Sequence, residues 1–168
     1  ERIAAVRNAV GDRVYIKVDA NEAYDSKSAI RLARKMADLG VEVFEQPVPR
    51  HQIEALQEIK RLSPIKVEAD QSVRSVEDAY HLIRGGVADS INTSIQKVGG
   101  MVEARQIAEM CQLAGVQCAL SNTAGSVLGD AAALRDRLDR QEAGCPGNDP
   151  AGVTSGTGAF KTIRASAS

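Results

Sequence analysis

The chain has 168 residues, and its 21 basic and 22 acidic side chains leave a formal net charge of −1 at pH 7. This balance argues against the strongly charged surfaces of nucleic-acid-binding and membrane-surface proteins, and we expect neither partner. The hydrophobic content of 43% is typical of a globular protein, and no apolar run approaches the roughly 18 residues that span a bilayer.

Three cysteines, at positions 111, 118 and 145, are odd in number and lack the CxxC spacing of zinc or redox sites. We expect reduced thiols and therefore a cytoplasmic protein. The first seven residues already show the amphipathic pattern of a helix and include no initiator Met. We therefore expect the chain to be a piece of a longer protein.

Short apolar segments then alternate with amphipathic ones along the chain. Strands that are apolar on both faces, as in a buried parallel sheet, are predicted at residues 14–18, 41–45, 65–69, 88–92 and 116–120. Apolar residues at helical spacing predict a helix after each of the first four strands. The first helix has Asp25 or Ser26 as its N-cap and ends near Gly40. The third begins with the capping box Ser75-Val76-Glu77-Asp78.

The regular alternation predicts an α/β fold, a partial (β/α)8 TIM-type barrel with about five βα units. An open doubly wound sheet is the weaker alternative, because the phosphate-binding patterns GxGxxG and GxxxxGK[ST] are absent. We expect residues 1–134 to form the partial barrel domain. Residues 135–168 are poor in large aliphatic side chains, and we expect an irregular tail without a final strand, disordered or a reading-frame artefact.

Three carboxylates stand at the ends of successive predicted strands: Asp19, Glu45 and Asp70, separated by 26 and 25 residues. The carboxyl ends of barrel strands meet at one rim, where uncompensated carboxylates would repel one another. Hard oxygen ligands suit Mg²⁺ or Mn²⁺, so we predict a divalent metal site formed by these three residues. The alternative is that each carboxylate caps the loop or helix that follows it.

The residues around these carboxylates form four blocks: Val18-Asp19-Ala20-Asn21, Phe44-Glu45-Gln46-Pro47, Glu68-Ala69-Asp70-Gln71-Ser72 and Lys97-Val98-Gly99-Gly100. In this order and at this spacing they resemble the enolase superfamily, in its mandelate racemase and muconate cycloisomerase branch. The resemblance covers roughly residues 1–134.

The resemblance implies a Mg²⁺-dependent lyase or isomerase. Such enzymes abstract the proton α to a substrate carboxylate through an enediolate, as dehydratases, cycloisomerases or racemases and epimerases. It further implies that Asp19, Glu45 and Asp70 are the metal ligands, that the substrate is a small carboxylate, and that the full-length parent is a homo-oligomer. Gln71 stands where many relatives have a glutamate.

Two departures from the family pattern concern the bases. Relatives carry a Lys-x-Lys base on the strand before the one that ends in Asp19, and this chain does not contain that strand. The second base is expected at Ser94, with a later histidine position near Asn122, and a serine does not act as a base unaided. Lys97 is the nearest substitute, although strand alternation would turn it to the other face. Ser94 and Lys97 remain the candidate catalytic residues.

Two consequences follow for function. Reactions in which a base acts on only one face of the substrate, dehydration or cycloisomerisation, are favoured over racemisation. The alternative function is that of an inactive fragment or a metal-binding pseudoenzyme. Residues at the strand ends are candidates for substrate binding: Asn21, Ser121 and Asn122. Lys17 shares a face with Asp19 one layer deeper, where it is either a charge partner of the ligands or a substrate contact.

Overall fold

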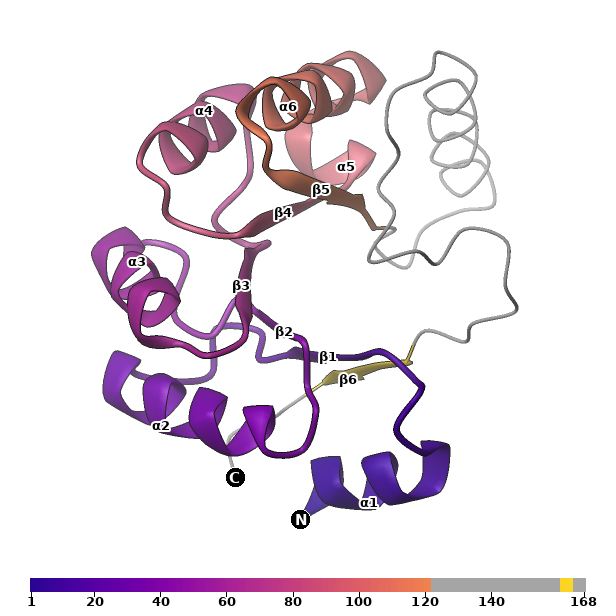
Figure 1. The fold of residues 1–168 in the computed structure, drawn as a ribbon. Helices are drawn as coiled ribbons and strands as arrows, with labels where there is room; N and C mark the ends of the chain where they lie inside the picture. Colours follow the sequence, from indigo (N-terminus) through magenta and orange to yellow (C-terminus); the bar gives the residue numbers. More distant parts are fainter. Residues whose placement is uncertain (122–160, 165–168) are drawn as a thin grey trace. The chain divides into compact units, whose positions relative to one another are not determined.

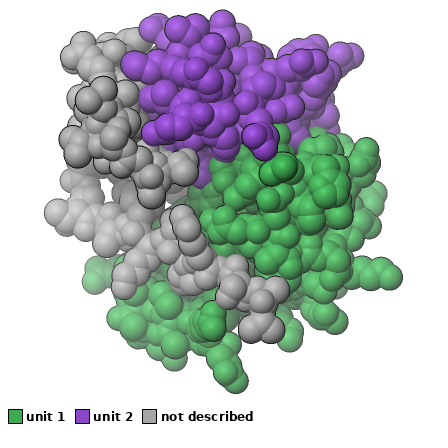
Figure 2. Space-filling model, turned by 180° about the vertical axis from the view of Figure 1, so that it is seen from behind, with its two compact units in different colours: residues 1–72, 87–89, 155–168 green, residues 73–86, 90–154 purple. Residues whose placement is uncertain are grey.

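The structure, a computed structural model, describes residues 1–121 and the strand at 161–164. The chain forms two compact units, which Figure 2 shows in different colours. Unit 1 comprises residues 1–72, 87–89 and 155–168, and unit 2 comprises residues 73–86 and 90–154. Within the described residues, none of the helices combines the length and apolarity needed to cross a membrane.

Unit 1 alternates helices and strands along the sequence. Its elements are α1 (Arg2–Val10), β1 (Ile16–Asp19), α2 (Ser26–Ala37), β2 (Val43–Glu45), α3 (Ile53–Leu62), β3 (Lys66–Ala69) and β6 (Lys161–Arg164). The strands are parallel and lie in the order β3-β2-β1-β6, and helices α2 and α3 lie side by side (Figure 1). The three strands predicted for this part of the chain are confirmed, each within two residues.

The core of unit 1 follows from alternation along its strands. Ile16 and Val18 are fully buried, and so are Phe44 on β2 and Val67 on β3. Residues two apart in a strand share a face, so Lys17 and Asp19 lie on the opposite face of β1 from this apolar pair. One face of the strands therefore packs the core, and the other presents charged side chains.

Side chains fix the ends of helix α2. Asp25 is its N-cap, with Oδ1 accepting a hydrogen bond of 2.9 Å from the Ser28 N–H, which resolves the choice between Asp25 and Ser26. At the other end, the guanidinium of Arg7 donates to the carbonyl oxygens of Leu39 at 3.0 Å and Gly40 at 2.7 Å. It also donates to two carbonyls of the loop before β1. Arg7 thus ties helix α1 to the turn after α2.

Strand β6 differs from the sequence-based expectation, because it lies in the segment predicted to be an irregular tail without a final strand. It pairs with β1 in parallel, from Lys161 opposite Ile16 to Arg164 opposite Asp19. The β-branched Thr162 and Ile163 favour extended backbone, but four residues are too few to show a strand period. The rest of the tail lies outside the described residues.

Unit 2 contains α4 (Val76–Arg84), β4 (Ser90–Thr93), α5 (Ile95–Val98), α6 (Met101–Ala114) and β5 (Gln117–Leu120). Strands β4 and β5 are parallel, and helices α4 and α6 lie side by side (Figure 1). The capping box is confirmed in part, since Ser75 Oγ accepts a hydrogen bond of 3.0 Å from the Asp78 N–H. The single turn of α5 was not expected from the sequence.

Candidate metal centre in unit 1

Acidic side chains form a row across the carboxyl ends of strands β1, β2 and β3 of unit 1. The register sets Asp19 of β1 opposite Glu45 of β2, and Glu45 opposite Glu68 of β3. Their exposed fractions are 7%, 3% and 5%, respectively. Asp70 follows β3 directly, two residues beyond Glu68. Buried carboxylates are unfavourable unless a cation or hydrogen-bond donors compensate their charge.

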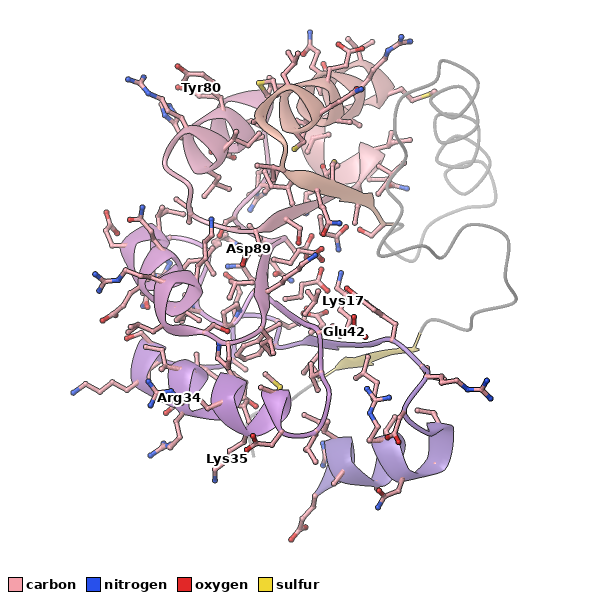
Figure 3. All side chains as sticks on the ribbon, viewed as in Figure 1. Lys17, Arg34, Lys35, Glu42, Tyr80 and Asp89 are labelled. Atoms are coloured by element: carbon pink, nitrogen blue, oxygen red, sulfur yellow. The ribbon has the colours of Figure 1, made fainter. Side chains whose placement is uncertain are left out.

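Lys17 supplies part of that compensation. Its Nζ lies 3.0 Å from Glu45 Oε2 and also donates to Glu68 Oε1. Burial lowers the pKa of Lys17, but the charges of Glu68 and Glu45 outweigh this effect, and the pKa lies above its ordinary value. Figure 3 labels Lys17, which projects from β1 in unit 1. These are the surroundings of a charge partner, while a substrate contact by Lys17 stays a prediction.

Asp19 is held by the residue two positions after it. The Asn21 N–H donates to Oδ1 at 3.0 Å, and the Asn21 amide Nδ2 donates to Oδ2 at 2.7 Å. Burial raises the pKa of Asp19, and the hydrogen bonds from Asn21 lower it. The negative charge of Asp70 raises it further, so the pKa of Asp19 lies above its ordinary value. Asp19 and Asp70 are therefore close enough to repel each other, a strain that a divalent cation would relieve.

Unusual backbone conformations shape the loops at this edge. Asn21 has φ 47° and Gln46 has φ 34°, in the left-handed region that non-glycine residues seldom adopt. Backbone pairing continues past the strand ends, with the Ala20 N–H donating to the Glu45 carbonyl at 3.0 Å. Strained backbone of this kind persists where surrounding contacts hold it, often at functional sites.

Gln46 is the residue that fixes these loops, and the sequence analysis did not single it out. It is fully buried. Its Nε2 donates to the Val48 carbonyl at 2.9 Å and to Ser72 Oγ at 3.0 Å. Its Oε1 accepts from the N–H groups of Asp70 at 3.0 Å and Ser72 at 3.1 Å. A side chain on the β2 loop thereby sets the position of the Asp70 backbone.

Gln71 extends the hydrogen-bond chain from Asp19 and Asn21. Its Nε2 donates to Asn21 Oδ1 at 3.0 Å. Its Oε1 is buried and accepts no hydrogen bond within the described part of the chain. An amide oxygen in this state is a ready acceptor for a cation or for water bound to one.

The oxygen donors at this edge are of the type that Mg²⁺ prefers: carboxylates of Asp19, Glu45 and Asp70, with the amide oxygen of Gln71 nearby. In the conformation described, residues 1–121 bring no three His, Cys, Asp or Glu side chains into a group that could hold a metal. Glu45 is paired with Lys17 instead. The residues at this edge fit a divalent cation in the chemical type of their donor atoms.

The other candidate residues lie in unit 2. Ser94 is the N-cap of α5, with Oγ accepting from the Lys97 N–H at 3.3 Å. Lys97 lies in this helix, so the prediction that strand alternation orients it was wrong; its Nζ donates to the Asn92 carbonyl at 3.0 Å. Ser121 follows β5 and donates from Oγ to the Thr93 carbonyl at 3.2 Å. Asn122 lies outside the described residues.

Parallel strands that alternate with helices and carry acidic side chains at their carboxyl ends are typical of (β/α)-barrel enzymes that bind divalent metals. The model of the family described as "Enolase C-terminal domain-like" matches residues 1–138, which include every described element except β6. The chain belongs to this family, within the enolase superfamily and its mandelate racemase and muconate cycloisomerase branch. The prediction of family and of a partial (β/α)8 barrel is thereby confirmed.

Individual relatives agree with this placement. A hydrophobic dipeptide epimerase of Enterococcus faecalis is 36% identical over 117 residues, which are 70% of this chain and 33% of the relative. Muconate cycloisomerase 1 of Rhodococcus opacus is 32% identical over 133 residues, 79% of this chain and 36% of the relative. The chain thus spans about a third of the length of these curated relatives.

A solved structure gives the same result for the fold. The dipeptide epimerase from Enterococcus faecalis, crystallised with Mg and the dipeptide L-Leu-L-Tyr, superposes with a TM-score of 0.77 at 34% identity. The match covers 79% of this chain and 38% of the epimerase chain.

Proposed function

We propose that this chain provides the Mg²⁺-binding part of an active site that removes the proton α to a carboxylate, with Asp19, Glu45 and Asp70 as metal ligands. The observation that carries the proposal is the pair of buried carboxylates, Asp19 and Glu45, that lie opposite each other at the strand ends, with the charge of Asp70 acting on Asp19. The relatives named as dipeptide epimerase and muconate cycloisomerase support the same chemistry, and one of them is crystallised with Mg and a dipeptide.

When bound, Mg²⁺ would neutralise the charge that grows on the substrate carboxylate as the α C–H bond breaks and its electron pair moves into the carboxylate. The residues of the chain prepare the place for it. Asn21 keeps both oxygens of Asp19 oriented, Gln46 fixes the Asp70 backbone, and Lys17 places a positive charge 3.0 Å from the buried Glu45 carboxylate. A small carboxylate substrate, a homo-oligomeric parent and a cytoplasmic location belong to this proposal as expectations.

Within this class we favour dehydration or cycloisomerisation, in which one base acts on one face of the substrate, over racemisation or epimerisation. The support comes from the two candidates for a second base. The Ser94 hydroxyl is occupied as a helix cap, and the Lys97 ammonium is bound to a backbone carbonyl. Neither group is arranged as a base.

The same observation favours a second candidate function, in which the chain binds the metal without catalysing turnover. A domain that keeps the ligands and lacks a working base would be a metal-binding pseudoenzyme or an inactive fragment.

Two measurements on one sample separate these possibilities. The first is Mn²⁺ binding followed by electron paramagnetic resonance, in which the signal of free Mn²⁺ falls as the ion binds. The second is exchange of the α-protons of L-Leu-L-Tyr or of another small carboxylate with D₂O, followed by proton NMR in the presence of Mg²⁺. Asp70→Asn is the matched variant for both.

Exchange that needs Mg²⁺ and is lost in Asp70→Asn supports the enzymatic proposal. Mn²⁺ binding that is lost in Asp70→Asn, without any exchange, supports the pseudoenzyme instead. Failure of the unaltered chain to bind Mn²⁺ contradicts both.

A further inference from the structure

Lys17 lies between two buried glutamates on neighbouring strands. Glu45 and Glu68 face each other in the β2–β3 register, and each is 5% exposed or less. The Lys17 ammonium contacts both, at 3.0 Å from Glu45 Oε2 and by a hydrogen bond to Glu68 Oε1. The Lys17 side chain itself is 18% exposed, so water screens these contacts only in part.

The carboxylates at this edge divide into two pairs with different partners. Glu45 and Glu68 share the ammonium of Lys17. Asp19 has hydrogen bonds from Asn21 and is close enough to Asp70 to interact with its charge. A divalent cation that engages Glu45 must therefore share this glutamate with Lys17.

We propose that Lys17 is a positioning residue that acts as an internal cation. It holds the carboxylate row together when no divalent ion is bound, and it limits the affinity for that ion by competing for Glu45. The metal part of this inference rests on the proposed function. The family resemblance assigns the ligands, whereas this role of Lys17 follows from its two contacts.

The inference predicts two effects of opposite sign when the charge is removed. Lys17→Met removes the ammonium that the buried Glu45 and Glu68 carboxylates share, so the metal-free chain loses stability. The same change removes a positive charge and a competitor for Glu45, so the chain binds Mg²⁺ more tightly. If Lys17 had only a packing role, its replacement would lower both the metal-free stability and the Mg²⁺ affinity, because a loosened site binds its ligand less well.

The test compares the unaltered chain with Lys17→Met, Lys17→Arg and a matched control, Lys35→Met. Lys35 is an exposed lysine that projects from helix α2 (Figure 3). Thermal unfolding in EDTA reports the metal-free stability, and calorimetric titration with MgCl₂ reports the affinity.

For Lys17→Met we expect a fall in Tm on the order of 10 °C in EDTA. We expect its Mg²⁺ affinity to rise by about tenfold. Lys17→Arg, which keeps the charge, and Lys35→Met should stay close to the unaltered chain in both measurements. If Lys17→Met fails to fold in EDTA, the double variant Lys17→Met/Glu68→Gln is used, because it also removes the negative charge of Glu68 and so its repulsion with Glu45. It should recover cooperative unfolding and still bind Mg²⁺ more tightly than the unaltered chain.

Each outcome decides the inference. The inference is overturned if Lys17→Met has an unchanged Tm in EDTA. It is also overturned if Lys17→Met and the double variant bind Mg²⁺ no more tightly than the unaltered chain. An unaltered chain that does not bind Mg²⁺ beside a Lys17→Met chain that does supports the inference while contradicting the proposed function. Absence of binding in every variant overturns both.

Discussion

The fully buried amide of Gln46 makes the sharpest stability prediction, for Gln46→Met. Methionine is unbranched and of similar volume, so the change removes hydrogen bonds while leaving little cavity. Four hydrogen bonds are lost, two donated and two accepted. At about 1 kcal/mol net for each, the variant should lose roughly 4 kcal/mol of unfolding free energy. That is a large part of the 5–15 kcal/mol typical of a folded domain.

Urea unfolding followed by far-UV circular dichroism measures this loss, with Gln52→Met as the control. Gln52 is exposed at the start of α3, and its side chain makes no cap hydrogen bond, so the control should change stability by less than about 0.5 kcal/mol. Gln46→Glu keeps the two acceptor contacts and loses the two donated ones, and it should also be less stable than the unaltered chain. A loss below about 1 kcal/mol for Gln46→Met would refute the argument that this amide holds the loops together.

Three further predictions concern single side chains. Arg7→Met removes donors to four backbone carbonyls and should lower the unfolding free energy by about 2 kcal/mol in urea; a recovery to full stability in Arg7→Lys would show that the planar fork is unimportant. The hydrogen bond from the Ser28 N–H lowers the pKa of Asp25, so its stabilising effect should be present above the ordinary carboxyl pKa and vanish as the pH falls through the lowered value. Unfolding of Asp25→Ala beside the unaltered chain at neutral and strongly acidic pH checks this, and a stability difference that persists in acid would contradict it. Burial, with the charges of Glu42 and Glu68, raises the pKa of Tyr15 from 10.0 to about 12. Its neutral form therefore stabilises the fold below pH 10, and the effect is lost as the pH rises toward 12. In a titration of phenolate absorbance, the ionisation step near pH 12 should be present in the unaltered chain and absent in Tyr15→Phe. Identical curves for the two chains would refute this assignment.

The features that the sequence predicted are those that depend on residues close together in the chain. The five strands within residues 1–121, the Ser75 cap, the choice of Asp25 or Ser26 as the other cap, and the carboxylates at the strand ends all follow from local pattern and from the blocks that resemble the superfamily. The alternation that placed Asp19 and Lys17 on one face is likewise a local property.

The parts that were missed depend on contacts between strands. Glu68 shares a face with Asp70 by the same alternation, but its pairing with Lys17 follows only from the β1–β2–β3 register. Gln46 reaches Ser72 and the Asp70 backbone across a separation of more than twenty residues, which no short pattern reveals. The single turn of α5 is too short for a period, and this is why Lys97 was assigned to the wrong kind of element.

Calorimetric titration of the purified chain with MgCl₂, with Asp70→Asn beside it, tests the central claim most directly. Asp38→Asn, a change at an exposed aspartate after α2, is the matched control. Saturable binding to one site, lost in Asp70→Asn and kept in Asp38→Asn, is the result predicted for a centre formed by Asp19, Glu45 and Asp70. Absence of binding in the unaltered chain, or binding that survives Asp70→Asn unchanged, would contradict it.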